Sequence, residues 1–319
     1  MNISGKFLSI AVTLALMSSF WSCQREEEPS PVVEEEVAFM VSTGEVQTKA
    51  IADGSNIDIL YYEVYGSDIE TAAEPMYEGS VKDVSDGKFV LNISLVKNVT
   101  YHFVFWAQVD GAGHYDVTNL RKVKIADYAD EKANDETRAA FFAYEKITVT
   151  GQADRSRNVI LKRPFSQINV GTSTYATSVA SLNVSASKMT VTNIADTFNT
   201  LSGQGEGATT VTFDSAPTPN GSKDLTDKLL ETKDADYYWL GMNYVIVCGD
   251  QDNVTVDAYF TTDKGEVHVN VPNVNIKENH RTNIVGNLLT THTVFNIVVD
   301  ELFIKPDHDY DDEGNPLKI

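Results

Sequence analysis

The chain has few cysteines and few basic residues. Its 319 residues include two cysteines, Cys23 and Cys248, and 25 lysines and arginines against 46 aspartates and glutamates. The formal net charge of −21 repels phosphate, so the composition argues against nucleic-acid binding and against attachment to anionic lipid through basic contacts. Cys248 ends the apolar run Val245–Cys248, which contains no activating base. We therefore expect a buried, unreactive thiol rather than a nucleophile.

The motifs of common enzymes are also missing. The sequence has no nucleophile elbow, phosphate-binding loop, dinucleotide fingerprint or paired-histidine zinc motif. Gly203, Gly205 and Gly207 are not followed by a strand-to-helix pattern, so we expect a flexible loop there. The acidic run Asp307–Gly314 begins like a calcium-binding loop, but its twelfth position falls beyond Ile319. We predict a protein without enzymatic activity and without a cofactor; a secreted hydrolase is the least favoured alternative.

A single long apolar run stands at the N-terminus. Lys6 precedes Phe7–Trp21, which has the length of a signal-peptide core and is too short to span a bilayer comfortably. Ser22 and Cys23 follow, as in lipoprotein signals that are cleaved before a lipid-bearing cysteine. We predict a signal peptide over residues 1–22 and lipidation of Cys23, with an ordinary secretory signal as the alternative. In both cases the chain leaves the cytoplasm.

The segment after the lipidation site is acidic. Residues 23–36 contain Pro29, Pro31 and the run Glu26–Glu28, and few apolar side chains. This composition is typical of a solvated tether. The three glutamates also resemble the acidic export signal of surface lipoproteins in the Bacteroidetes.

Beyond the tether, the pattern is that of short β-strands. Apolar and polar residues alternate through Val99–Val109 and Val254–Phe260, and Asp110-Gly111 and Asp263-Lys264 are turn signals. Strands at spacings of about 10–12 residues predict an all-β fold of antiparallel sandwiches. Further strands are expected over Ile57–Tyr65, Phe89–Leu95, Ile147–Thr150, Asn158–Leu161, Ser166–Val170, Leu182–Val191, Thr209–Phe213, Tyr237–Cys248, Val267–Val271 and Ile284–Leu289.

Two domains fit the length of the chain. Pro164 follows one predicted strand, and comparable sets of strands lie on either side of it. We predict an N-terminal sandwich over residues 37–163, a C-terminal sandwich over 164–304 and an acidic tail over 305–319. Two segments break this pattern: 127–143 has a composition that favours a short helix or a helical loop, and 225–232 is a second such segment.

Four segments taken in order resemble one protein family. They are Val46–Ala50, Leu161–Gly171, His280–Leu289 and the terminal strand Thr293–Ile304. On these residues the chain resembles the fimbrillin-like surface lipoproteins of the Bacteroidales. The resemblance implies two transthyretin-like (Greek-key) β-sandwich domains and a lipid anchor in the outer membrane at the cell surface. It also implies a fimbrial subunit that assembles with other subunits into a type V pilus, as a homo- or hetero-polymer, or a fimbrillin-like adhesin.

The same resemblance implies functional residues. In that family a trypsin-like protease removes an N-terminal segment, and a strand from the next subunit fills the vacated groove by β-strand addition. On this chain, cleavage would fall between Lys49 and Ala50, and Val37–Val41 would be the strand removed. The donor strand would present Phe295, Ile297, Val299, Leu302 and Ile304. An ordinary last strand of the second domain is the alternative for this segment.

A rival function is that of a monomeric glycan-binding surface lipoprotein of a polysaccharide-uptake system. Exposed aromatic rings could stack on sugar rings of a host or other glycan ligand, and Trp106 and Trp239 are the candidates. Packing of these strand residues against a partner sheet or domain is the alternative for both.

Overall fold

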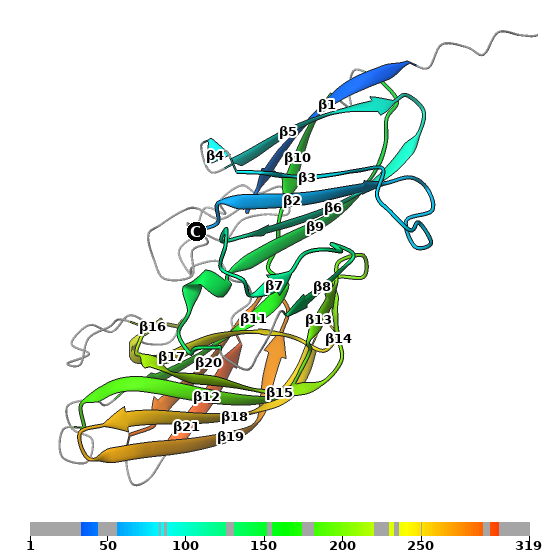
Figure 1. Ribbon diagram of the computed structural model, residues 1–319. Coiled ribbons are helices and arrows are strands. Elements are labelled where there is room, and N and C mark those ends of the chain that lie inside the picture. The colour runs from blue at the N-terminus through cyan, green and yellow to red at the C-terminus, as the bar shows by residue number, and fades with distance from the viewer. Residues whose placement is uncertain are drawn as a thin grey trace, which may run out of the picture. The chain divides into compact units, whose positions relative to one another are not determined.

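The computed structural model describes residues 33–43, 56–82, 84–85, 88–125, 131–151, 155–173, 182–219, 230–232, 236–249, 251–289 and 294–299. These residues form strands joined by turns, so the predicted all-β sandwich fold is confirmed (Figure 1). The described residues contain one helical turn, the 3₁₀ turn η1 (Glu136–Arg138). None of their helices is long and apolar enough to cross a membrane. The predicted signal peptide and acidic tail lie outside the described residues.

Two sheets are built from the first half of the chain. The order in one is β10-β1-β5-β4 and in the other β3-β2-β6-β9. The rings of Phe39 and Phe103, one from each sheet, have centroids 4.5 Å apart, so the sheets pack face to face. The first sheet contains β1 (Glu34–Ser42), β4 (Val84–Ser85), β5 (Lys88–Val96) and β10 (Ser156–Ile160). The second contains β2 (Ile59–Tyr65), β3 (Tyr77–Val81), β6 (Thr100–Gln108) and β9 (Ala140–Thr148).

Two further sheets are built from the second half. Their orders are β16-β17-β11-β20-β21 and β15-β12-β18-β19, and Ile168, Val191 and Ile284 belong to one hydrophobic core. The first of these sheets contains β11 (Phe165–Thr172), β16 (Leu230–Glu231), β17 (Asp236–Ile246), β20 (Arg281–Asn287) and β21 (Val294–Val299). The second contains β12 (Val184–Ile194), β15 (Thr209–Pro217), β18 (Gln251–Thr262) and β19 (Gly265–Lys277).

The first strand of each half occupies an equivalent position. Among the described strands all pairings are antiparallel except two, β1 with β10 and β11 with β20. β1 lies between parallel β10 and antiparallel β5, and β11 lies between parallel β20 and antiparallel β17. Each half therefore places its first strand in the interior of a sheet, where both edges of that strand are paired.

A small sheet joins the halves. It has the order β14-β13-β8-β7, with Val123 of β8 opposite Phe198 of β13. Its strands therefore come from both sides of the expected boundary at residues 163–164. They belong to one compact unit, Glu34–Ile319. The strands are β7 (Tyr115–Asp116), β8 (Lys122–Ile125), β13 (Thr197–Asn199) and β14 (Gln204–Glu206).

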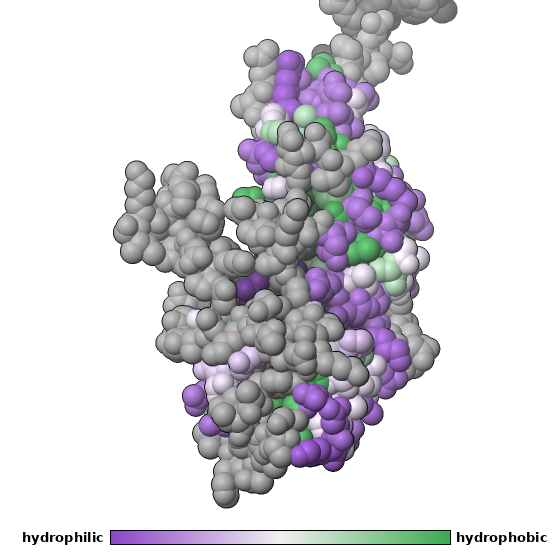
Figure 2. Space-filling model, turned by 90° about the vertical axis from the view of Figure 1, so that its left-hand side faces the viewer, coloured by the Kyte–Doolittle hydropathy of each residue, from purple (hydrophilic) through white to green (hydrophobic). Residues whose placement is uncertain are grey.

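Hydrophilic residues cover much of the visible surface. Figure 2 shows them over most of the coloured part of one face, with smaller hydrophobic areas between them. This distribution agrees with the strongly acidic composition and with the burial of most large apolar side chains of the strands.

Neither segment that could form a short helix does so among the residues that the structure describes, although the first contains one helical turn. Within 127–143, η1 is three residues long, and strand β9 begins at Ala140. Within 225–232, the described strand is β16. The alanine-rich start of β9 pairs with β6, and Phe142 lies opposite Trp106. Local helix propensity is a weak preference, and sheet pairing with a buried neighbour outweighs it here.

The glycine-rich segment is also different from the prediction of a flexible loop. Gly205 lies in β14, and its N–H and C=O exchange hydrogen bonds of 3.4 and 3.1 Å with Gly249. Gly203 and Gly207, with φ of +69° and +82°, form the turns on either side. A Cβ atom added to Gly205 would overlap the backbone carbonyl oxygen of Val247. The segment is therefore a closely packed strand that requires glycine at its centre.

Replacing Gly205 with alanine is expected to lower the free energy of unfolding by about 1–3 kcal/mol, because two backbone segments must separate. Gly66→Ala is the matched control, since a Cβ there would lie at an ordinary 3.5 Å from the Asp68 side chain. Urea denaturation of both variants measures the difference. Equal stability of the two variants would contradict the close approach at Gly205.

Candidate functional site

Strand β1 is the first candidate site, because it contains Val37–Val41, the segment that the family resemblance implies is removed. Val37, Phe39 and Val41 point inward and are 0% exposed. The strand pairs with β5 through all nine of its residues and with β10 from Ala38 to Ser42. Without β1, both neighbouring strands would present unpaired backbone groups beside an apolar trough.

Phe39 is the centre of this site. Its ring centroid lies 4.5 Å from that of Phe103 and 6.0 Å from that of Phe105. These three rings bring together the two sheets of the first half, and the flanking Val37 and Val41 fill the same layer. The predicted segment Val37–Val41 is thus a central strand. Outside the described residues lie the predicted lipidation site, cleavage bond and end of the donor strand: Cys23, Lys49, Ala50, Leu302 and Ile304.

Strand β21 carries the described part of the predicted donor strand. It is the last strand of its sheet in the described part of the chain and pairs antiparallel with β20. Phe295 and Ile297 are half-buried against the second core, and Val298 packs against the first core. Val299 lies opposite Thr282. The strand has apolar contacts on both faces, and its position at a sheet edge is also that of an ordinary last strand.

The two tryptophans are not exposed, which agrees with the alternative that they pack inside the protein and not with stacking of their ring faces on a glycan. Trp106 is 0% exposed; its ring lies 5.2 Å from Tyr115 and 6.2 Å from Phe198, and its Nε1–H donates to Gln108. Trp239 is 5% exposed and donates to the Gly241 carbonyl. The outer face of β6 is covered by β7 and β13, so the alternation of β6 does not separate a buried face from a solvated one.

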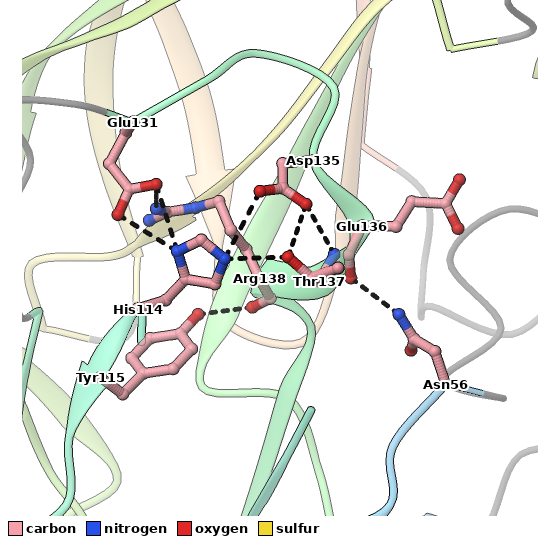
Figure 3. Close-up of polar contacts among 8 residues, drawn as sticks. All are labelled: Asn56, His114, Tyr115, Glu131, Asp135, Glu136, Thr137 and Arg138. Carbon is pink, nitrogen blue, oxygen red and sulfur yellow. Dashed lines mark hydrogen bonds and ion pairs between the residues drawn. The ribbon is translucent and has the colours of Figure 1, made fainter. Parts of the chain in front are cut away.

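A second candidate site is a cluster of charged side chains around His114 (Figure 3). His114 Nδ1 lies 3.3 Å from a carboxylate oxygen of Glu131, and Nε2 lies 2.9 Å from Thr137 Oγ1 and 3.4 Å from Asp135. Arg138 forms an ion pair with Glu131. All members of the cluster lie within residues 114–138. Glu131 and Arg138 are almost completely buried, so the cluster forms only when the rest of the chain packs around them.

The charges of this cluster compensate one another. Burial alone would lower the pKa of His114, but the hydrogen bonds that its ring donates to Asp135 and Glu131 outweigh burial and raise that pKa above its ordinary value. For Asp135, burial would raise the pKa, but hydrogen bonds with His114 and Thr137 lower it to about 2. The pKa of Glu131 is lowered in the same way by His114 and Arg138. The geometry favours an imidazolium between two carboxylates.

Thr137, His114 and Glu131 contact one another in the arrangement of a catalytic triad, with a nucleophile, a base and an acid that orients the base. Their hydrogen bonds do not suit nucleophilic catalysis. The Thr137 hydroxyl donates to Asp135 Oδ1 at 2.6 Å, so its proton is not directed at His114. The described residues also contain no group of histidine, cysteine, aspartate and glutamate side chains suited to hold a metal ion. The arrangement supports structural stabilisation rather than catalysis.

Cys248 agrees with the expectation of an unreactive thiol but is not fully buried, in contrast to the prediction from the sequence. It is half-buried, and its Sγ–H donates to the Gly207 carbonyl at 3.0 Å. Burial, followed by the carboxylates of Asp252 and Asp196, raises the pKa of the thiol. The thiolate that nucleophilic chemistry requires is therefore disfavoured.

The His114 cluster was not predicted from the sequence. Its members have no fixed spacing, and their meeting depends on the path of residues 114–138. One local signal exists: Asp135 accepts from the Thr137 N–H and hydroxyl, an N-cap pattern that aspartate followed two residues later by threonine favours.

Comparison with solved structures shows which proteins share this fold. A candidate polysaccharide-binding protein from Bacteroides thetaiotaomicron has a TM-score of 0.51 and 12% identity, covering 84% of this chain and 96% of its own. A candidate cell adhesion protein from Bacteroides ovatus has a TM-score of 0.53 and 11% identity, covering 86% and 99%. A candidate adhesin from Bacteroides thetaiotaomicron has a TM-score of 0.50 and 11% identity, covering 85% and 97%. At these identities the similarity establishes the fold alone.

Sequence comparison gives the family. No curated protein matches the chain. A family model described as a family of unknown function, DUF6562, matches residues 29–319, which is nearly the whole chain. The chain therefore belongs to the DUF6562 family.

Proposed function

We propose that this protein is a non-enzymatic surface adhesin that acts as a fimbrial subunit. A protease cuts after Lys49, β1 leaves its sheet, and a strand of another subunit takes its place. The observation that carries this proposal is the position of β1, a central strand with three completely buried inward side chains. Such a slot accepts a strand with alternating apolar residues, because that strand restores both the backbone ladder and the burial.

The fold supports an adhesin. Two of the solved structures that share it are described as candidate adhesion proteins of Bacteroides species. Their similarity extends over more than four fifths of this chain. The chain also has the sequence features of an exported protein, since Phe7–Trp21 precedes Cys23 and an acidic tether follows. Lipidation of Cys23 would hold the precursor in the outer membrane at the cell surface.

The segment that contains β21 is the proposed donor strand. Phe295, Ile297 and Val299 alternate along it, as the inward residues Val37, Phe39 and Val41 do along β1. The alternation shifts by one residue between Val299 and Leu302, so Leu302 and Ile304 would extend the contact through a bulge or on a strand that is buried on both sides. The partners are other pilus subunits, identical or related to this chain.

The test is an unboiled SDS gel of material sheared from producing cells, combined with N-terminal sequencing of each band. We expect a ladder of heat-labile multimers whose chains begin at Ala50. Lys49→Gln should abolish the ladder and leave the precursor. Lys97→Gln is the matched control, because it removes a lysine from a turn in another part of the sequence and should leave the ladder unchanged.

A monomer that begins at Cys23 in the unsubstituted protein would overturn the fimbrial proposal. It would favour the second candidate function, a monomeric glycan-binding lipoprotein. The observation for that function is the similarity to a candidate polysaccharide-binding protein. Its contacts would have to come from residues other than Trp106 and Trp239, because both are buried.

A further inference from the structure

Residues 131–138, here named the latch segment, connect the first half of the chain to the open edges of two strands in the second half. The Ala133 N–H donates to the Asp214 carbonyl at 2.8 Å, and the Asp214 N–H donates to the Glu131 carbonyl at 2.7 Å. The Asn134 N–H donates to the Met242 carbonyl at 2.9 Å. The latch segment therefore pairs with β15 and with β17, one strand from each sheet of the second sandwich.

Asn134 is the central contact of the latch segment. Its Oδ1 accepts from the Met242 N–H at 2.7 Å, and its Nδ2 donates to Ser187 Oγ and to the Pro217 carbonyl, both at 2.8 Å. Its backbone has φ of +63°, a conformation that asparagine tolerates better than most residues. One side chain thus joins β12, β15 and β17.

The other side of the latch segment is held by His114. The imidazole contacts Glu131 near one end of the segment and Asp135 and Thr137 near the other (Figure 3). Tyr115 adds a hydrogen bond from its hydroxyl to the Arg138 carbonyl at 2.5 Å. Ala133 belongs to the second core and Ala139, just after the segment, to the first. Movement of this segment would therefore disturb both cores.

The balance of charge depends on the proton of His114. The titratable or charged groups that face the imidazole are Glu131, Asp135, Arg138 and Tyr115. Two carboxylates and one guanidinium leave one negative charge uncompensated when the imidazole is neutral. With the imidazole protonated, the cluster is neutral overall, which is the favoured state for partly buried charges.

From this geometry we infer that protonation of His114 fastens the latch segment against β15 and β17, so that the contact between the halves of the chain responds to pH. The direction follows from the His114 pKa, which contacts with Asp135 and Glu131 raise above the value in the unfolded chain despite burial. Stabilisation by His114 is therefore complete below the unfolded pKa of about 6.5 and is lost as the pH rises through the folded pKa. The pKa of the Asp135 carboxyl is lowered to about 2, so its carboxylate stabilises the folded chain fully above the ordinary pKa of aspartate. This stabilisation is lost only in strong acid. The latch segment is thus firmest in mildly acidic solution and weakens on the alkaline side.

Amide hydrogen exchange of the full chain tests this inference. Protection factors, which correct for the intrinsic pH dependence of exchange, are measured for the amides of Ala133, Asn134 and Asp214. Between about pH 6 and about pH 9 we expect them to fall about tenfold, while the amides of β12 keep their protection. In His114→Gln, which keeps a polar side chain but cannot carry the charge, protection should be low and independent of pH.

His268→Gln is the matched control. His268 also contacts a carboxylate, Asp257, at 2.7 Å, but lies on the exposed surface of β19. This variant should keep the pH dependence at the latch segment. Unchanged protection across this pH range in the unsubstituted protein, or the same fall in His114→Gln, would overturn the inference. If His114→Gln fails to fold, NMR titration of His114 in the unsubstituted protein decides, because a midpoint at or below about 6.5 would also overturn it.

Discussion

Replacing Phe39 with alanine is expected to lower the free energy of unfolding by about 3–5 kcal/mol, the range for deleting a buried aromatic side chain. The Phe39 ring is 0% exposed and packs on Phe103 and Phe105 from the opposite sheet. The cavity would lie at the centre of β1, so the variant should also release this strand more readily. Urea denaturation measures the first effect, and exchange of the β1 amides measures the second.

Met40→Ala provides the control within the same strand. Met40 is adjacent to Phe39 but points to the outer face, where it is half-buried opposite Val90. Its loss should cost about 1 kcal/mol or less. Equal destabilisation by the two substitutions would show that the inward face of β1 does not hold the strand in place, and would weaken the proposed role of the slot.

Trp106→Ala is expected to have an effect of the same size, about 3–5 kcal/mol, because the indole is enclosed by Tyr115 and Phe198. These contacts join β6 to β7 and β13, which both follow it in sequence, so the small sheet formed by β7, β8, β13 and β14 should lose order together with the core. Thermal unfolding and near-ultraviolet circular dichroism measure the two changes.

Two further variants separate the indole ring from its hydrogen bond. Trp106→Phe keeps an aromatic ring but leaves Gln108 Oε1 without its donor, so we expect a smaller loss of about 1–3 kcal/mol. Tyr77→Ala removes an aromatic side chain that is 40% exposed and should change stability by about 0.5 kcal/mol or less. A stable Trp106→Ala variant would show that the indole is not part of the core and would return Trp106 to the candidates for ligand binding.

The strands could be predicted from the sequence because their signal is local. The alternation through Val99–Val109 predicted β6, and the turn at Asp263-Lys264 predicted the hairpin between β18 and β19. What the alternation could not show is what covers each face. Val104 and Trp106 fall on the side of β6 that carries polar residues, yet both are completely buried, because β13 arrives there from almost a hundred residues further along the chain.

The two candidate sites could be predicted from the sequence to different degrees. The resemblance directed attention to Val37–Val41, and the structure adds that both edges of this strand are paired. The latch segment gave no comparable signal. The alanines and charged residues of the surrounding segment 127–143 favoured a helix, but the backbone of the latch segment instead bonds to Asp214 and Met242, which are distant in sequence. Partners of this kind depend on the assembled sandwich and cannot be deduced from local spacing.

The parallel pairing of β1 with β10 has a consequence for the order of folding. Glu34 of β1 lies opposite Val96, so β1 and β5 can pair after about a third of the chain is available. Ala38, however, lies opposite Ser156, so the other edge of β1 must wait for a much larger loop to close. Closing such a loop costs conformational entropy, and contacts of high sequence separation slow folding. We therefore expect the second edge of β1 to pair with β10 late, only after nearly half of the chain has been synthesised.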